Sequence, residues 1–420
     1  MTASASHNAN GTDVHGKEQN LHRERTARGN GPSQLHPLAP IAIYVHWPYC
    51  AKICPYCDFN VRKNKKVDVE PWLTAFKNDL TYWRAVSGPR QLVSIYFGGG
   101  TPSLCPPEIL SSVIETAQSL WLTDEAIEVT LETNPTDAEQ DLFSDLSDRG
   151  FNRLSLGVQS FNDDQLNFLG RNHDGASARK AIVAALGLFK NVSFDLIYAL
   201  PGETPQDWRL RLRDALMLGA DHLSAYQLTV EPGTAFERAV NRKHWIPTDD
   251  DMAADLFDIT QEETSRAGLH AYEISNHARK GARSRHNLAY WRGEDYIGIG
   301  PGAHGRLRTP DGRLAIETHY DPAVYLQQAE EKKHGAAKMD ILSSYEVYTE
   351  RLAMGLRSSE GIILNEQDQT IIGNTVNRLV EDGFCKLTNN HLVATENGRR
   401  VLNALIAELL SDIEDNSAID

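Results

Sequence analysis

The stretch IYVHWPYCAKICPYCDFN, residues 43–60, runs directly from an apolar segment into three closely spaced cysteines. Cys50, Cys54 and Cys57 follow the spacing C-x3-C-x2-C. Thiolates are soft ligands that suit zinc, copper(I) and iron–sulfur clusters. A structural zinc site normally closes with four ligands, whereas a cubane held by three cysteines leaves one iron open. We therefore favour an iron–sulfur cluster, and zinc completed by His46 is the alternative.

The composition indicates an ordinary globular protein. The other two cysteines, Cys105 and Cys385, stand alone in the sequence and are predicted to be small buried core residues. Five cysteines in 420 residues are too few for a disulfide framework, so we expect a reducing compartment and a cytoplasmic location. No stretch approaches the roughly 18 apolar residues of a membrane span. The formal net charge of -15 argues against nucleic acid as the main partner.

Short β-rich runs alternate with amphipathic stretches between residues 41 and 265. The runs are IAIYVHW, LVSIYFGGG, AIEVTLETNP, RLSLGVQS, VSFDLIYALPGET and HLSAYQLTVEPGT. This alternation predicts parallel strands joined by helices. Six such units predict an α/β fold, an open partial (β/α)6 barrel rather than the closed barrel of eight. Residues 1–40 have no apolar period and are predicted to form a disordered tail.

Small or polar residues stand where each predicted strand ends. They include the run from Gly98 to Thr101, then Glu132, Gln159 and Asp195. In parallel βα architectures the active site lies at the carboxyl ends of the strands. The pattern therefore predicts that these side chains surround one site.

Two further segments follow the predicted barrel. Residues 266–334 are expected to connect it to the rest of the chain, and they contain HNLAYW at residues 286–291. Residues 335–420, called the C-terminal module below, read as helix, short hairpin and helix, which predicts a helical, winged-helix-like unit. It carries seven Lys and Arg against fourteen Asp and Glu. A DNA-binding wing is ordinarily basic, so we interpret the module as a structural cap or protein-docking surface.

The cysteine triplet followed by YFGGGTP resembles the radical S-adenosylmethionine (SAM) family. The likeness extends over residues 41–235, through LETNP, RLSLGVQSF, LGRNHD and FDLIYALPGET, to its oxygen-independent coproporphyrinogen III oxidase group. The resemblance implies a 4Fe-4S cluster on the three cysteines, whose open iron takes SAM, and electron transfer that gives a 5′-deoxyadenosyl radical. It implies SAM contacts at Tyr44, Tyr56, Gly99, Gly100, Thr101, Glu132, Gln159, Arg171 and Asp195.

One departure and one motif narrow the resemblance. The oxidases have a further cysteine two positions after the third, where this sequence has Phe59. CDFN and HNLAYW resemble the heme-chaperone members of the group instead. The resemblance implies that the motif binds heme through four residues, His286, Asn287, Tyr290 and Trp291. A helix would bring His286 and Tyr290, four positions apart, to one face, and a histidine can supply an axial nitrogen to heme iron. His46 and His304 are rival ligands.

Two functions are compatible with this resemblance. The leading hypothesis is a heme chaperone that binds the cluster, SAM and heme and passes heme to an acceptor such as a respiratory hemoprotein. The alternative is a radical SAM enzyme of the coproporphyrinogen III oxidase type. Both imply an electron donor such as a flavodoxin or a ferredoxin, if SAM is cleaved. A scaffold stabilised by zinc, without redox chemistry, is a third interpretation.

Overall fold

The computed structural model describes residues 39–63, 66–124, 127–136 and 140–415. Of the tail predicted over residues 1–40, residues 1–38 lie outside the described residues. None of the described helices is long and apolar enough to cross a membrane.

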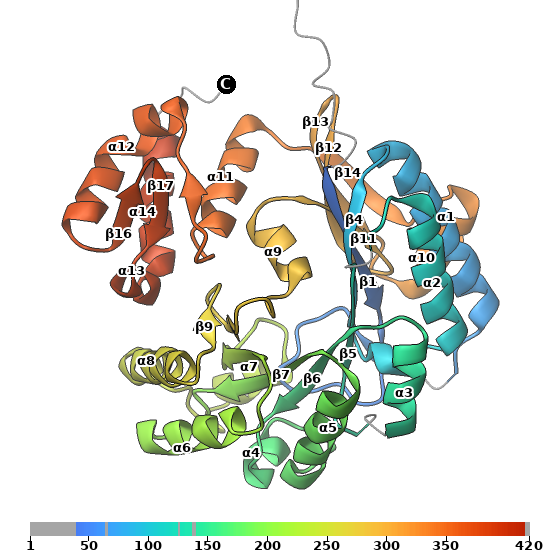
Figure 1. Ribbon diagram of the computed structural model, residues 1–420, viewed down its shortest axis with the longest axis horizontal. Coiled ribbons are helices and arrows are strands. Elements are labelled where there is room, and N and C mark those ends of the chain that lie inside the picture. Colours follow the sequence, from blue (N-terminus) through green and yellow to red (C-terminus); the bar gives the residue numbers. More distant parts are fainter. Residues whose placement is uncertain (1–38, 64–65, 125–126, 137–139, 416–420) are drawn as a thin grey trace, which may run out of the picture. The chain divides into compact units, whose positions relative to one another are not determined.

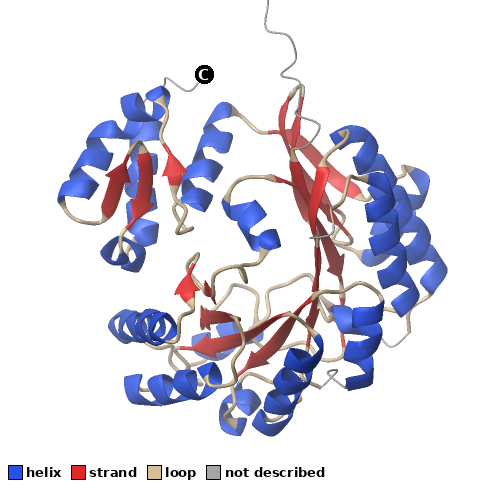
Figure 2. Cartoon of the chain, in the orientation of Figure 1, coloured by secondary structure: helices blue, strands red, loops and turns tan. Residues whose placement is uncertain are grey.

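Six parallel strands form the centre of the main sheet, in the order of the chain. They are β1 (Pro40–Trp47), β4 (Gln91–Gly99), β5 (Glu128–Thr133), β6 (Arg153–Gln159), β7 (Asn191–Tyr198) and β8 (His222–Gln227). Each corresponds to one of the six predicted runs, so the prediction of six βα units is confirmed. Figures 1 and 2 show the helices along the outer side of these strands.

The connecting helices cover the strands through apolar faces. They are α1 (Val69–Ser87), α2 (Pro107–Leu120), α3 (Gln140–Asp148), α4 (Asp163–Phe168), α5 (Gly175–Leu188), α6 (Pro205–Leu216), α7 (Ala235–Asn241) and α8 (Asp250–Arg266), with a 3-10 turn, η2 (Pro102–Leu104), before α2. Ile43 and Val45 of β1 share one core with Trp72 and Phe76 of α1. Each such side chain contributes about 1.5–3 kcal/mol when fully buried.

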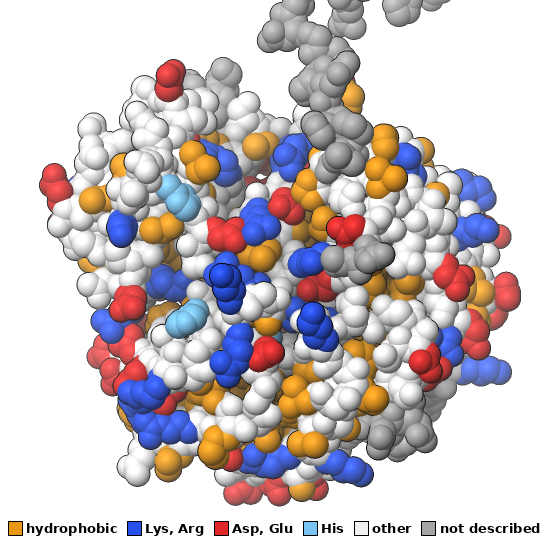
Figure 3. All heavy atoms as spheres, in the orientation of Figure 1, with side chains coloured by type: hydrophobic (Ala, Val, Ile, Leu, Met, Phe, Trp, Pro, Cys, Tyr) orange, Lys and Arg blue, Asp and Glu red, His pale blue; other side chains and the backbone are white. Residues whose placement is uncertain are grey.

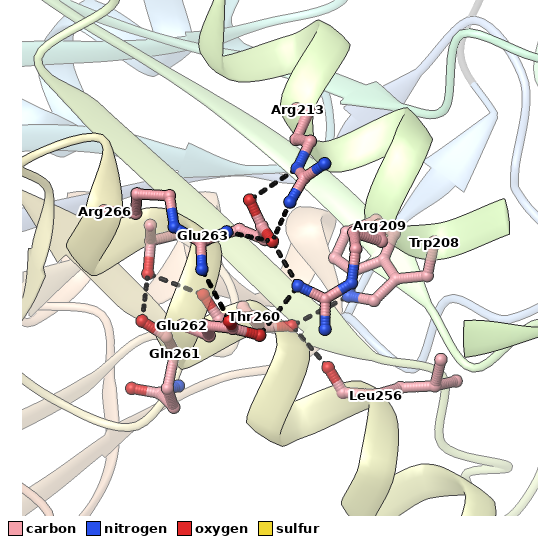
Figure 4. A network of polar contacts seen from close by, with 10 residues as sticks. Trp208, Arg209, Arg213, Leu256, Thr260, Gln261, Glu262, Glu263 and Arg266 are labelled. Atoms are coloured by element: carbon pink, nitrogen blue, oxygen red, sulfur yellow. Dashed lines mark hydrogen bonds and ion pairs between the residues drawn. The ribbon is translucent and has the colours of Figure 1, made fainter. Parts of the chain in front are cut away.

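An ion-pair network joins α6 to α8 on the outer side of the barrel (Figure 4). The Glu263 carboxylate, whose side chain is 2% exposed, accepts hydrogen bonds from Arg209, Arg213 and Arg266. Hydrogen bonds from these arginines, Arg213 first, lower the pKa of Glu263 to about 2 despite its burial. The network therefore holds an ionised carboxylate between two helices.

The segment over residues 266–334, expected to connect the barrel to the rest of the chain, adds strands to the sheet. β11 (Asp295–Ile299) pairs in parallel with the free edge of β1, and β12 (His304–Thr309) and β13 (Gly312–Thr318) continue the sheet antiparallel. β14 (Ala336–Ile341) completes that end, while β10 (Asn276–Ala278) and β9 (His270–Ala271) follow β8 at the other. Several of these strands are short, and β11 has only five residues, so the two-residue period is weak. α9 (Arg285–Trp291) and α10 (Pro322–Glu331) lie in the same segment.

The C-terminal module, predicted from residue 335, has a hydrophobic core of its own that begins after β14, because β14 belongs to the main sheet. Its elements are α11 (Ser344–Gly355), β15 (Ile362–Ile363), α12 (Glu366–Glu381), β16 (Cys385–Thr388), β17 (His391–Ala394), α13 (Glu396–Arg400) and α14 (Leu402–Asp415). The three strands form an antiparallel sheet in the order β15, β17, β16. Leu352, Ile372, Leu392 and Leu409 pack together between this sheet and the helices. The order α12, hairpin, α14 agrees with the predicted helix, hairpin and helix.

Candidate functional site

The cysteines lie on a loop that two short parallel strands close at its base. β2 (Tyr49–Cys50) pairs with β3 (Arg62–Lys63), and we call residues 50–61 the cysteine loop. Cys50 is buried, and Cys54 and Cys57 are half-buried. Within the loop, the Cys57 amide donates to the Cys54 carbonyl at 3.2 Å. Burial raises the pKa of the Cys57 thiol to about 11, so its ionisation requires positive charge nearby, which a bound metal supplies.

The tip of the cysteine loop docks on the loop between α4 and α5. A side chain at Gly170, where φ is +69°, would place its Cβ 2.5 Å from the Cδ of Pro55. The Pro55 carbonyl accepts from the Phe236 amide at 3.0 Å, and the Tyr56 ring lies 6.2 Å from the Phe236 ring. Glycine in LGRNHD is therefore needed both for its backbone conformation and for the close approach of Pro55.

Arg171 connects the cysteine loop to the carboxyl ends of β5 and β6. Its Nη1 donates to Cys54 Sγ at 3.3 Å and to the Tyr56 hydroxyl at 3.4 Å. Its Nη2 donates to the Gly157 carbonyl at 2.8 Å and to Asn134 Oδ1. The guanidinium thus brings a positive charge directly beside one of the three thiols.

The glycine run at the end of β4 makes room for protein atoms as well as for a ligand. At Gly99, where φ is +105°, a Cβ would lie 2.6 Å from the His46 ring, and at Gly100 it would lie 2.6 Å from the Tyr49 carbonyl oxygen. The Gly100 amide donates to the Trp47 carbonyl at 2.7 Å. The run packs against β1 and the cysteine loop, so its backbone is held rigidly beside the site.

Two carboxyl groups face the site from β5 and β7. Glu132 Oε1 accepts from the Tyr96 hydroxyl at 2.7 Å. Burial, with the charge of Asp195 adding to it, raises the pKa of Glu132 to about 7. Burial likewise raises the pKa of Asp195 to about 6, although Arg171 opposes this shift. Both carboxyls therefore change charge close to neutral pH.

Nearly all of the predicted cluster and SAM residues line one cavity of about 410 Å³, which we call the first cavity. The predicted residues that line it are Cys50, Cys54, Tyr56, Cys57, Gly99, Gly100, Thr101, Glu132, Gln159, Arg171 and Asp195. Gln159 has a φ of +68° at the end of β6, an uncommon conformation outside glycine. Tyr44 does not line the cavity. Its ring lies behind Gly98, 2.9 Å from where a Cβ would stand.

His46 is occupied on both ring nitrogens. Its Nδ1 is hydrogen-bonded to the Tyr44 hydroxyl at 3.2 Å, and its Nε2 to the Asn60 carbonyl at 2.9 Å. Across the residues that the structure describes, no three His, Cys, Asp or Glu side chains are grouped so that they could hold one metal ion. His304, the other rival, is exposed at the start of β12.

His286 lies inside the protein, where the sequence led us to expect a ligand open to heme. It is 1% exposed, with Nδ1 hydrogen-bonded to Ser94 Oγ at 3.0 Å and Nε2 to the Tyr290 hydroxyl at 2.8 Å. Burial lowers its pKa to about 3, so the imidazole is neutral. α9 packs against the sheet because the backbone amides of its first two residues donate to the buried Glu128 carboxylate. The amide nitrogen of Arg285 lies 2.9 Å from Glu128 Oε1.

The other motif residues, Asn287, Tyr290 and Trp291, line a second cavity of about 920 Å³. Side chains from β7, β8, α8 and the C-terminal module complete it. Tyr226 and Gln227, at the end of β8, line both cavities. The two cavities are therefore neighbours across the carboxyl end of one strand.

Several site residues escaped the sequence analysis. Asn134 anchors Arg171, Tyr96 holds Glu132, and Tyr226 with Gln227 stands between the cavities. Asn134 follows Glu132 in LETNP, and Gln227 ends a predicted strand. Both could have been predicted, because polar residues at the carboxyl ends of parallel strands tend to surround the site. Tyr96 points to the site from within a strand and carries no such signal.

Comparison with known proteins identifies the family. Residues 44–215 match the model of the Radical SAM superfamily. The mitochondrial radical S-adenosyl methionine domain-containing protein 1 of Dictyostelium discoideum is 38% identical over 432 residues, which cover 90% of this chain and 96% of that protein. The chain belongs to the radical SAM superfamily.

Two further radical SAM proteins refine the likeness. The heme chaperone HemW of Escherichia coli is 34% identical over 379 residues, covering 89% of this chain and 99% of that protein. The structure of coproporphyrinogen III oxidase (HemN) from Escherichia coli superposes with a TM-score of 0.74 at 20% identity, covering 89% of this chain and 91% of that one. At that identity the likeness shows the fold, and it confirms the predicted partial barrel. This radical SAM protein thus has relatives named as heme chaperones and shares its fold with HemN.

Proposed function

We propose that this radical SAM protein is a heme chaperone that binds a 4Fe-4S cluster, SAM and heme and transfers heme to an acceptor hemoprotein. The observation that carries the proposal is the adjacency of the two cavities, which share Tyr226 and Gln227. The first cavity carries three thiols, and aromatic residues of HNLAYW line the second. A heme bound in the second cavity would lie next to SAM bound in the first.

Cys50, Cys54 and Cys57 are the proposed cluster ligands. Thiolates bind separate irons of a cubane, so they need not meet at one point as the ligands of a single zinc ion do. His46, with both nitrogens engaged, is a poor fourth ligand for zinc.

Two buried atoms without hydrogen-bond partners support SAM binding in the first cavity. Among the described residues, Asp195 Oδ1 and Arg171 Nε have no partner, and each such group costs about 1–3 kcal/mol. SAM offers an ammonium, ribose hydroxyls and a carboxylate, which are suitable partners. When bound, the cluster and SAM supply one-electron chemistry. The proposed contacts are Tyr56, Gly99, Gly100, Thr101, Glu132, Gln159, Arg171 and Asp195, with Tyr44 supporting them from behind Gly98.

Heme is assigned to the second cavity, against α9. Tyr290 and Trp291 offer flat apolar surface to a porphyrin. His286 reaches the cavity only through Tyr290, whose hydroxyl holds its Nε2 at 2.8 Å. Axial ligation by His286 would require that hydrogen bond to be exchanged for iron. We therefore propose that Asn287, Tyr290 and Trp291 contact heme, with His286 behind them.

The alternative, an oxidase acting on coproporphyrinogen III, lacks one residue in this chain. Phe59 occupies the position of the further cysteine of the oxidases, and it lines the first cavity with its side chain 60% exposed. The fold shared with HemN supports an enzyme no more than a chaperone, because one fold hosts many functions. We therefore expect no decarboxylation of coproporphyrinogen III.

One experiment tests the proposal against its alternatives. The full chain is purified without oxygen, its cluster is reconstituted, and iron, sulfide, SAM binding, heme binding and coproporphyrinogen III conversion are measured. We expect a cluster, SAM binding and heme that passes to an apo-hemoprotein. Robust conversion of coproporphyrinogen III, or a protein with a cluster that binds no heme, would overturn the chaperone. Zinc in place of iron and sulfide would overturn the cluster.

The partners follow from this function. The acceptor is a hemoprotein, such as a respiratory one, and SAM cleavage would require a one-electron donor such as a flavodoxin or a ferredoxin. A cytoplasmic location stays a prediction, because the Dictyostelium discoideum relative is named as mitochondrial. Fractionation of the producing cell with an antibody to this chain would decide the location.

A further inference from the structure

The C-terminal module contributes part of the lining of the second cavity. Arg357, which follows α11, and residues 399–404 line it together with Tyr290 and Trp291 of α9. On the face drawn in Figure 3, Lys and Arg side chains lie over α9 and β9 with Asp and Glu side chains among them. The C-terminal module is acidic as a whole, so its three arginines in the cavity, Arg357, Arg399 and Arg400, are exceptions to its general charge.

Two of these arginines are bonded to neutral oxygens. Arg357 donates from Nη1 to the Ala353 carbonyl at 2.6 Å and from Nη2 to Asn403 Oδ1 at 2.9 Å. Arg399 donates from Nη2 to the Glu273 carbonyl at 2.5 Å. Within the described part of the chain, neither guanidinium has an ion pair within 4.0 Å of a carboxylate. Arg400, their neighbour in the cavity, differs because it pairs with Asp258 at 2.7 Å.

Burial makes these unpaired charges costly. Arg357 is half-buried, Arg399 lies in the same cavity, and desolvation lowers the pKa of both guanidiniums. Buried charges are normally paired, because removing a cation from water without a counter-charge is strongly unfavourable. A cavity with two such cations is therefore suited to an anionic ligand.

Carboxylates supply only part of that counter-charge: the charges of Glu273 and Glu396 act on Arg399 without an ion pair within 4.0 Å, whereas burial alone shifts the pKa of Arg357. Glu273 uses its carboxylate within its own loop, accepting from the Ser275 amide at 3.0 Å and from Asn276 Nδ2 at 2.5 Å. Burial raises the pKa of Glu273, and the charge of Arg399 opposes that shift. Asp250 lines the cavity from the first turn of α8. Because Arg400 already pairs with Asp258, Arg357 and Arg399 are left to face Asp250 and Glu273, and the Glu273 carboxylate is engaged in its own loop.

The rest of the cavity suits a flat apolar ligand. Phe257, Tyr290, Trp291 and Leu402 line it together with Tyr198. Aromatic rings offer large rigid contact surfaces to a planar molecule. A ligand that is flat and apolar over most of its surface and carries carboxylates at one edge would match both the rings and the arginines.

We infer that Arg357 and Arg399 bind the propionate carboxylates of the heme in the second cavity. The C-terminal module thereby completes the heme site, and arginine suits this role because its guanidinium pairs with carboxylates through two parallel hydrogen bonds. The inference rests on the proposed function, since it assigns the carboxylate end of the same ligand. Coproporphyrin is also flat and carries carboxylates, so its binding must be compared with that of heme.

Heme and its dimethyl ester, which lacks the propionate charges, distinguish the inference from general porphyrin binding. Both are titrated into the full reconstituted chain, with coproporphyrin III as a third ligand. We expect the wild-type chain to bind heme about ten- to a hundredfold more tightly than the ester, the loss typical of hydrogen bonds to a charged group. Tighter binding of coproporphyrin III than of heme would overturn the choice of heme.

Variants then test the two arginines. Arg357→Gln and Arg399→Gln should each weaken heme binding about tenfold and leave ester binding unchanged. Arg399→Lys, which keeps the charge, should restore part of the loss. Arg378→Gln is the matched control: it removes an arginine of the same module that pairs with Glu408 on α14 and does not line the cavity.

The outcomes separate this inference from the proposed function. If the wild-type chain binds neither porphyrin, heme binding itself is overturned. If it binds heme and ester equally, or if both glutamine variants keep the preference for heme, heme binding stands and the role of the arginines is overturned. Equal loss of heme and ester in Arg357→Gln and in Arg399→Lys would indicate a damaged cavity and would also overturn the carboxylate role.

Discussion

Tyr96 stacks on His286, with ring centroids 4.7 Å apart and ring planes inclined by 20°, while its hydroxyl donates to Glu132 at 2.7 Å. His286 is in turn hydrogen-bonded to Tyr290 at 2.8 Å. A continuous series of contacts thus leads from a carboxylate of the first cavity to an aromatic side chain of the second. The histidine of HNLAYW supports both sites at once.

His286→Ala tests this role. The variant removes the ring on which Tyr96 stacks and the hydrogen-bond partner of Tyr290. Tyr96 is then held less firmly against Glu132, so we expect SAM binding to weaken by up to about tenfold, the lower end of the loss expected when a hydrogen bond to a charged group is broken. Heme should also dissociate faster. SAM titration and the Soret band measure the two effects. A shifted Soret band with unchanged SAM binding would instead indicate that His286 is the axial ligand.

SAM binding is expected to depend on pH through Glu132 and Asp195. Burial raises the pKa of Glu132 to about 7 and that of Asp195 to about 6. Both therefore gain negative charge as the pH rises from 5.5 to 8, and a cationic ligand should bind more tightly at the higher pH. Isothermal titration across this range measures the change. Glu132→Gln should flatten the upper part of the profile, and an unchanged profile in that variant would remove Glu132 from the site.

Cluster assembly is expected to require Cys54 and not Cys105. Reconstituted wild-type chain should hold about four irons and four sulfides, the content of the cubane class. Cys54→Ser should lose most of the visible absorption, because a thiolate ligand is missing. Cys105→Ala, at a cysteine buried in the main core, should keep it. A full cluster in Cys54→Ser would show that the ligands are wrongly assigned.

Gly170→Ala should impair the cluster without touching a cysteine. The new Cβ would meet Pro55 Cδ at 2.5 Å in a left-handed backbone conformation, so the cysteine loop must shift. Iron content per chain and the thermal midpoint measure the result. Gly202→Ala is the control: its φ is +76° and nothing lies within 4 Å, so it carries only the backbone cost of about 1–2 kcal/mol. Equal iron contents in both variants would contradict the proposed docking.

Glu263 should stabilise the fold in a pH-dependent way. Its folded pKa of about 2 lies below the ordinary value of 4.5 for a glutamate, so its contribution is present above about pH 4.5 and is lost as the pH falls towards 2. Glu263→Gln should lower the free energy of unfolding by about 1–2 kcal/mol at pH 7, since the arginines are partly exposed. Urea denaturation at pH 7 and pH 3 measures this. A difference that does not shrink at pH 3 would contradict the assignment.

The sequence predicts the centre of the fold well, because long parallel strands bury both faces and their apolar runs are unmistakable. β1 and β7 are examples. The strands of residues 266–334 are short, and β11 owes its place to pairing with β1, some 250 positions earlier in the chain. Such long-range pairing leaves no local signal.

The candidate site, like the fold, could be predicted from the sequence only in part. Glu132, Gln159 and Asp195 stand at the ends of predicted strands and line the first cavity together, as expected for parallel strands. The setting of His286 depends on Glu128, Ser94 and Tyr96 from two other strands. The motif predicted to bind heme therefore has two parts: His286 is buried and supports the site, whereas Asn287, Tyr290 and Trp291 line the second cavity. Only the assembled sheet distinguishes the two parts.

The pairing of β1 with β11 also bears on how the protein is made. β1 leads into the cysteine loop, and one of its edges is covered only when residues 295–299 have been synthesised. Asn60 of the loop likewise donates to carbonyls of Pro301 and Tyr320. During translation, about three quarters of the chain must be synthesised before the cysteines reach their final setting, so until then a nascent chain presents its thiols on an unfinished support.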